Sequence, residues 1–308
     1  MNRLPARPVA SDRPLAISLL LGVSGWFAGL FLLVFVALLF RPDTAASAGI
    51  VGTFLLAAAW CLFTVARDGE PVFVAQLALA LSIAGQCFVV YALTQHTTDD
   101  APVAAVALVL QAALALVMPN QLHRTLSTLF ATIAWALTLH FTLLGNAWHR
   151  GDAPGVASSL PAALGGWLLA WGPVAAGLWW AIRNEAALAA RGWARTAGAV
   201  ITGLIAGLAF ATLASQPFES LAWYGNEAAG NLALWPLFSA LGALGALAAA
   251  FARRQRALMA LCVIAALLHA GRFYYALGTS LLVKSLLMLA MGGAFVAAAH
   301  VLRTKETA

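Results

Sequence analysis

Long apolar runs, separated by short polar breaks, follow one another along the whole chain. Most runs are rich in Leu, Ala and Val and extend for about twenty residues, the length that an α-helix needs to cross about 30 Å of hydrocarbon. A β-barrel would show alternating segments of about ten residues instead. The pattern therefore predicts an all-α polytopic transmembrane helix bundle. We expect ten spans, at 15–40, 46–66, 72–94, 102–118, 125–145, 161–182, 196–214, 231–251, 257–271 and 279–301.

Pairs of small residues four positions apart recur in the predicted spans. They are Gly25 with Gly29, Gly203 with Gly207, and Gly245 with Ala249. Such pairs let helix backbones approach closely. Because the chain holds 26 glycines, the pairs indicate packing within a bundle rather than a specific dimer.

The composition agrees with a membrane protein. Of 308 residues, 63% are hydrophobic and 9% are charged, whereas charged residues make up about a quarter of an ordinary globular chain. So few charges cannot cover a water-facing surface, which excludes a soluble enzyme, a disordered chain and a disulfide-stapled secreted module. The three cysteines lie singly within apolar runs, so we predict neither a disulfide nor a metal site there.

The distribution of basic residues predicts how the chain is threaded. With the N-terminus inside, thirteen Lys and Arg residues fall in inner segments and three in outer ones, and Lys284 falls within a span. Cytoplasmic segments carry such an excess of Lys and Arg. We therefore predict an N-in, C-in topology, with cytoplasmic segments at 1–14 and 303–308 and a single transmembrane domain over 15–302. The net charge of +6 then reflects topology and indicates no nucleic-acid partner.

No Asp or Glu falls within the ten predicted spans. Ion-coupled carriers usually place carboxylates inside the membrane, and intramembrane proteases of the aspartyl or zinc type need carboxylates or His–Glu pairs. The sequence also lacks the common hydrolase and phosphate-loop motifs. His96, His123 and His149 are predicted to lie in loops, with no second ligand at metal-binding spacing. We therefore expect no catalytic residue, no metal ligand and no cofactor.

The ionisable residues that do fall in or beside the spans gather in the predicted outer half of the membrane. With polar residues at a similar depth, the group comprises His140, His269, Arg272, Tyr274, Tyr275, Lys284 and Ser285. His269 and Arg272 are three positions apart and share a helix face. Three interpretations stay open: the cations extend to the outer head groups, they pair with outer-loop carboxylates, or they bind an anionic head group, substrate or partner segment.

The residues from Arg272 to Gly292 have a distinctive order. Phe273-Tyr274-Tyr275 is followed by Leu277, by Thr279-Ser280-Leu281-Leu282-Val283-Lys284-Ser285 and, after an apolar turn, by Gly292. This order resembles the C-terminal signature of a bacterial membrane family, domain of unknown function 4401. Ser280 stands where that family more often has Leu. The length of the chain, the predicted helix count and the basic inner segments also resemble the family.

The resemblance implies a multi-pass protein of the bacterial inner (plasma) membrane with no established activity. Family members are often encoded beside a related multi-spanning family, domain of unknown function 2157, and a small anchored protein with a Gly-Asp-Tyr-x-x-Leu-x-x-Pro motif. Besides the lipid bilayer, the resemblance thus implies either of these proteins as a partner.

Three functions stay open. The first is a non-enzymatic subunit of a bacterial membrane complex, with the outer-half group contacting a partner or lipid head group. The second is a small-molecule transporter of the drug/metabolite-exporter type, built as a five-plus-five inverted repeat, although the two halves show no self-similarity. The third is an enzyme acting on envelope lipids at the outer face, with His140, His149 or His269 as base and Lys284 and Arg272 holding phosphate.

Overall fold

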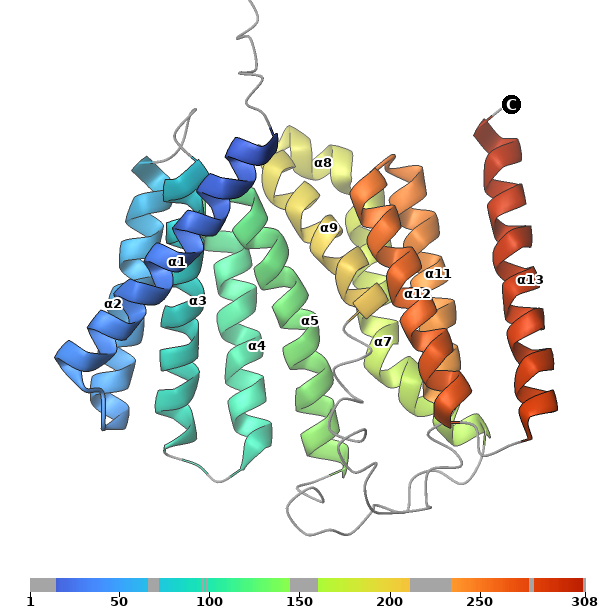
Figure 1. Cartoon of the computed structure of the whole chain (residues 1–308), viewed down its shortest axis with the longest axis horizontal. Helices are drawn as coiled ribbons and strands as arrows, with labels where there is room; N and C mark the ends of the chain where they lie inside the picture. The colour runs from blue at the N-terminus through green and yellow to red at the C-terminus, as the bar shows by residue number, and fades with distance from the viewer. Residues whose placement is uncertain are drawn as a thin grey trace, which may run out of the picture. The chain divides into compact units, whose positions relative to one another are not determined.

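The computed structural model describes residues 15–65, 72–95, 97, 99–144, 160–210, 234–276 and 280–306. Every regular element in these ranges is an α-helix, and each of the ten predicted apolar runs coincides with one of the long helices (Figure 1). Contacts divide the chain into two compact units. The first comprises Met1–Thr98 with Met118–Asn120, and the second comprises Asp99–Val117 with Gln121–Ala308.

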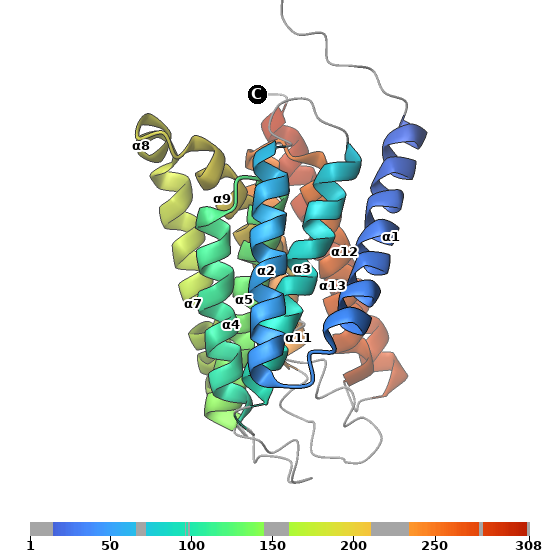
Figure 2. The ribbon, with the colours of Figure 1, turned by 90° about the vertical axis from the view of Figure 1, so that its left-hand side faces the viewer.

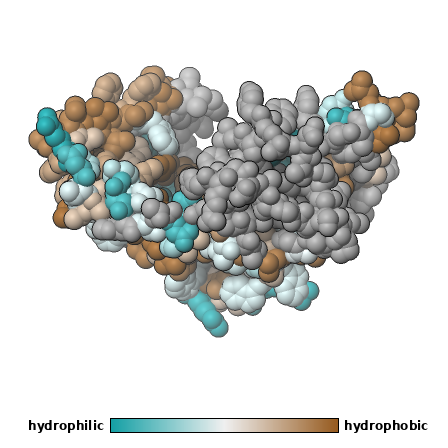
Figure 3. Space-filling model, turned by 90° about the horizontal axis from the view of Figure 1, so that it is seen from below, coloured by the Kyte–Doolittle hydropathy of each residue, from teal (hydrophilic) through white to brown (hydrophobic). Residues whose placement is uncertain are grey.

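Apolar helices identify the chain as an all-α membrane protein. Five described helices are long and apolar enough to cross a membrane. Three more contain shorter apolar stretches of 10–17 residues, at Ala194–Phe210, Leu237–Ala252 and Leu281–Ala290. Large side chains such as Phe31, Leu38, Ile50 and Val65 are at least 70% exposed. A soluble protein rarely exposes so wide an apolar surface. On the face seen from below in Figure 3, brown, apolar residues lie among white and teal ones. The number of spans and their direction stay predictions.

The first unit consists of α1 (Leu15–Phe40), α2 (Ala45–Val65) and α3 (Val72–Thr94). The α3 helix packs against both others (Figure 2), and its Leu81 joins a buried core with Val36 and Leu55. Gly52 of α2 and Gly85 of α3 face each other. A Cβ on Gly52 would lie 2.8 Å from the carbonyl oxygen of Gly85, so glycine is what allows these two backbones to approach.

The second unit is built around one central helix, α9. Its long helices are α4 (Asp100–Val117), α5 (Gln121–Leu144), α7 (Leu160–Arg183), α9 (Ala194–Phe210), α11 (Leu234–Ala252), α12 (Arg256–Ala276) and α13 (Leu281–Glu306), with the short α8 (Glu185–Ala190). The α9 helix contacts α5, α7, α8, α11 and α12. Its Ile201 and Ile205 are completely buried, in a core shared with Trp171 of α7 and Cys262 of α12.

Two of the three small-residue pairs do pack closely. Gly25 and Gly29 of α1 approach α3, and Gly203 and Gly207 of α9 approach α5. A Cβ on Gly203 would lie 2.5 Å from the Cβ of Thr128. Gly245 of α11 differs, because a Cβ there would meet nothing within 4 Å.

Three helices extend well beyond their predicted ranges. The α5 helix begins at Gln121, so His123, which we expected in a loop, lies in a helix and is 1% exposed. The ring can be buried because its Nδ1 forms a hydrogen bond of 3.2 Å with the hydroxyl of Ser127, one turn further along the helix. The α12 helix continues to Ala276, beyond the predicted end at 271. The α13 helix likewise continues to Glu306, beyond the predicted end at 301. In all three places the helix extends past the apolar run from which it was predicted.

The Gly207→Ala variant should destabilise the second unit. The added methyl would overlap the side chain of Thr132, and overpacking of this kind costs about 1–3 kcal/mol. Gly245→Ala is the matched control, since its methyl would enter open space. Thermal unfolding of both purified variants in detergent should give a lower midpoint for Gly207→Ala alone. Equal midpoints would show that α5 and α9 do not approach as closely as described.

Candidate functional site

Polar side chains of the second unit gather at the two ends of α12. This helix of 21 residues is about 30 Å long. The group predicted from the sequence lies at its Ala276 end. A second network, which the sequence analysis did not predict, lies at its Arg256 end. Figure 1 shows α8 at the same end of the second unit as the C-terminus of α13.

At the Ala276 end, the structure brings Lys284 and Tyr274 together. The Nζ of Lys284 lies 5.2 Å from the centre of the Tyr274 ring, within the distance at which an ammonium is attracted to an aromatic face. The contact joins α13 to α12. The hydroxyl of Ser285 donates a hydrogen bond to the carbonyl of Leu281 at 2.9 Å, so it is engaged within its own helix.

His269 is separate from this contact. Its side chain is completely buried, and its Nε2 lies 2.9 Å from the carbonyl oxygen of Ala209 in α9. A carbonyl can only accept, so Nε2 carries the proton and donates it. Arg272 is half-buried and lies one turn further along α12. His140 and Tyr275 lie in α5 and α12, but their side chains are outside the described residues.

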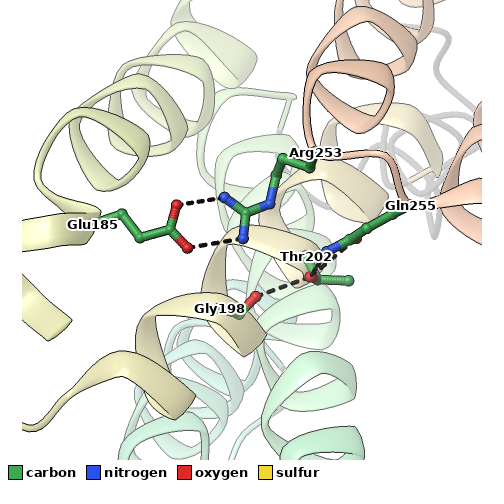
Figure 4. A network of polar contacts seen from close by, with 5 residues as sticks. All are labelled: Glu185, Gly198, Thr202, Arg253 and Gln255. Atoms are coloured by element: carbon green, nitrogen blue, oxygen red, sulfur yellow. Dashed lines mark hydrogen bonds and ion pairs between the residues drawn. The ribbon is translucent and has the colours of Figure 1, made fainter.

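At the Arg256 end, Glu185 and Arg253 form a two-pronged ion pair (Figure 4). The two guanidinium nitrogens donate to the two carboxylate oxygens at 2.6 and 2.9 Å. Glu185 begins α8 and Arg253 directly follows α11. The pair therefore fastens the short helix to the turn between α11 and α12.

Gln255 fastens the same turn to α9. Its Nε2 lies 3.5 Å from the hydroxyl of Thr202, which donates in turn to the carbonyl of Gly198 at 2.9 Å (Figure 4). At the neighbouring helix start, Arg124 of α5 donates to the hydroxyl of Thr196 at 2.7 Å. Two of these polar contacts join neighbouring segments to α9, and the ion pair joins α8 to the turn between α11 and α12.

The ion pair keeps both its members charged. The hydrogen bond from Arg253 lowers the pKa of Glu185, although burial opposes this, and the same bond raises the pKa of Arg253. Because both oxygens of Glu185 already accept hydrogen bonds, this carboxylate is poorly suited to act as a general base. Among the described residues, no group of three or more His, Cys, Asp and Glu side chains could hold a metal ion.

These features define an α-helical membrane protein in which hydrogen bonds and an ion pair connect the ends of neighbouring helices. The family described as "Domain of unknown function (DUF4401)" matches residues 14–305. The chain belongs to this family, so the resemblance at the C-terminus is confirmed. No curated protein and no solved structure matches the chain.

The Glu185→Gln variant should lose part of the acid sensitivity of the wild-type protein. Since the folded pKa of Glu185 is lowered, the ion pair stabilises the fold above the ordinary Glu pKa of about 4.3. This contribution disappears as the pH falls through the lowered pKa. The pair is partly exposed, so we expect about 1 kcal/mol at neutral pH.

Unfolding midpoints in detergent, measured from about pH 7 down to about pH 3, test this pair. The wild-type midpoint should approach that of Glu185→Gln at the acid end. Arg254→Gln is the control, because it removes a neighbouring exposed arginine and leaves the pair intact. Parallel curves for wild type and Glu185→Gln would contradict a stabilising role.

Proposed function

We propose that the protein is a non-enzymatic subunit of a bacterial inner-membrane complex. It crosses the bilayer ten times with both termini in the cytoplasm, and its α12–α13 group, centred on Tyr274 and Lys284, contacts a partner. Arg272, Tyr275 and Ser285 belong to the same short stretch of chain.

The exposure of α13 carries this proposal. Its large apolar side chains at 281, 282, 283, 286, 288, 289 and 296 are between 38% and 74% exposed. At 3.6 residues per turn these positions cover more than half of the helix circumference. Among the described elements, α13 contacts chiefly α12. An apolar helix with so much open surface has room for another helix beside it, as well as for lipid.

Lys284 adds chemistry to this surface. A cation within an apolar helix is costly unless a compensating group lies nearby. The ring of Tyr274 supplies part of that compensation, and a carboxylate of a partner would supply more. Candidate partners are those that the family resemblance implies, the related multi-spanning protein and the small anchored protein with the Gly-Asp-Tyr motif.

The arginines of the second unit support the proposed threading. Arg124, Arg183, Arg191, Arg195, Arg253, Arg254 and Arg256 all lie at helix junctions on the α8 side. Arg272 and Lys284 lie toward the opposite end of α12. An excess of arginine on one side is what cytoplasmic segments show, so we place the α8 side in the cytoplasm and Lys284 toward the exterior.

The two other functions gain no support from the described contacts. An inverted repeat of five and five helices would divide the chain between α5 and α7, whereas contacts divide it between α3 and α4. An outer-face enzyme would need a histidine near Lys284. Of the three candidate histidines, His269 bonds instead to the carbonyl of Ala209, and Lys284 lies on the ring of Tyr274. His149 and the side chain of His140 lie outside the described residues.

The Lys284→Ala variant should retain less of a bound partner. Loss of a hydrogen bond to a charged group costs about 1.5–3 kcal/mol, so we expect about a tenfold decrease in co-purified partner or more. Purification in mild detergent with quantitative mass spectrometry of bound proteins measures this. Thr53→Ala is the control, because Thr53 lies in α2 of the first unit and its hydroxyl bonds within its own helix.

Two further measurements complete this test. Lys284→Arg should retain the partner, since it keeps the positive charge, and unfolding midpoints should show that all variants fold. A folded Lys284→Ala protein that keeps every wild-type partner would contradict the proposal.

A further inference from the structure

Arginine and tryptophan side chains surround the short helix α8. They come from the end of α7, the α8–α9 turn and the start of α9, and we refer to them as the α8 surface: Trp179, Trp180, Arg183, Arg191, Trp193 and Arg195. All six side chains are exposed. The tryptophans are 58%, 56% and 50% exposed in chain order. Three exposed indoles close together in the chain indicate a binding surface, because each indole buries a large apolar area when it contacts a partner.

The backbone holds the α8 surface in place. The N–H groups of Arg191 and Trp193 both donate to the carbonyl of Leu188, at 3.1 and 3.0 Å. Gly192 between them has a φ of +83°, which glycine adopts without strain. The carbonyl of Trp193 then accepts the N–H of Ala197 at 2.8 Å as α9 begins. Arg191 and Trp193 are thus presented by a closed turn with defined hydrogen bonds.

Arginine and indole already pair on this surface. The guanidinium carbon of Arg183 lies 4.2 Å from the centre of the Trp179 ring. Stacking on the ring orients the guanidinium and leaves its N–H groups available at the edge. An arginine held in this way can bind phosphate oxygens in a forked geometry.

The charge around α8 is strongly positive. Glu185 is the one acidic residue between Trp179 and Arg195, and the turn from Phe251 to Arg256 contains none. Arg253 occupies both oxygens of Glu185, so this carboxylate does little to neutralise the other arginines. Together the two segments carry six arginines and one glutamate. The excess attracts an anion to the place where α7 and α11 end.

We propose that the α8 surface binds the head group of an anionic phospholipid in the adjacent leaflet. Tryptophan prefers the depth of the head groups, and arginines near the membrane attract anionic lipids. A soluble anion would engage the arginines but would make no contact with the indoles. A lipid satisfies both, because its phosphate meets Arg183, Arg191 and Arg195 while its glycerol and upper acyl chain cover Trp179, Trp180 and Trp193.

Native mass spectrometry of the full-length protein in detergent tests this binding. Dioleoyl-phosphatidylglycerol and dioleoyl-phosphatidylcholine are added in separate samples at equal concentration. The wild-type protein should retain the anionic lipid in preference to the zwitterionic one. The double variant Arg191→Gln/Arg195→Gln should lose affinity for phosphatidylglycerol on the order of tenfold. Trp193→Ala should weaken the binding of both lipids.

Arg41→Gln is the control, because Arg41 is an exposed arginine in the first unit, between α1 and α2. It should bind phosphatidylglycerol as the wild type does, and unfolding midpoints should show that every variant folds. Equal retention of the two lipids by the wild type would overturn the proposal. So would a folded double variant with full affinity, or displacement of bound lipid by an excess of inorganic phosphate, which would indicate a site for soluble anions.

Discussion

A peptide group in hydrocarbon must find its hydrogen-bond partner within the protein, since no water is there to supply one. Several polar side chains of the described helices meet the same requirement. The hydroxyls of Thr53 and Thr138 donate to carbonyls one turn back, at 2.8 and 2.7 Å. The indole of Trp135 reaches the carbonyl of Ala170 in the next helix at 2.7 Å. His269 does the same toward α9. Thr53 and Thr138 thus bond within their own helices, whereas Trp135 and His269 join neighbouring helices. Most of the arginines of the second unit lie near helix ends.

Hydropathy predicted the existence of the ten long helices, but it predicted their ends less well. An apolar run marks where hydrocarbon begins and ends, whereas a helix continues for as long as its polar side chains find partners. His123 finds Ser127 within α5, so that helix starts earlier than its apolar part. The six residues of α8 are too few for any periodic pattern. Spacing alone likewise could not tell that Gly203 faces Thr128 while Gly245 faces open space.

Some polar contacts were likewise predictable from the sequence and others were not. Depth along predicted spans placed Tyr274 and Lys284 near each other, and the structure brings them into contact. The pairing of Glu185 with Arg253 was out of reach, because 68 positions separate them and arginine-rich segments are explained equally well by topology. The one sequence feature that pointed to the pair was Glu185 itself, a single acidic residue among many arginines. The sequence placed His269 and Arg272 on one helix face and in one candidate group. In the structure His269 is buried and bonds to the carbonyl of Ala209, so it connects α12 to α9.

The Glu185–Arg253 ion pair also has a consequence for biogenesis. Glu185 leaves the ribosome 68 residues before Arg253, so the ion pair cannot form until α9 and α11 have both been synthesised. The α8 helix therefore gains this contact late, after most helices of the second unit have been made.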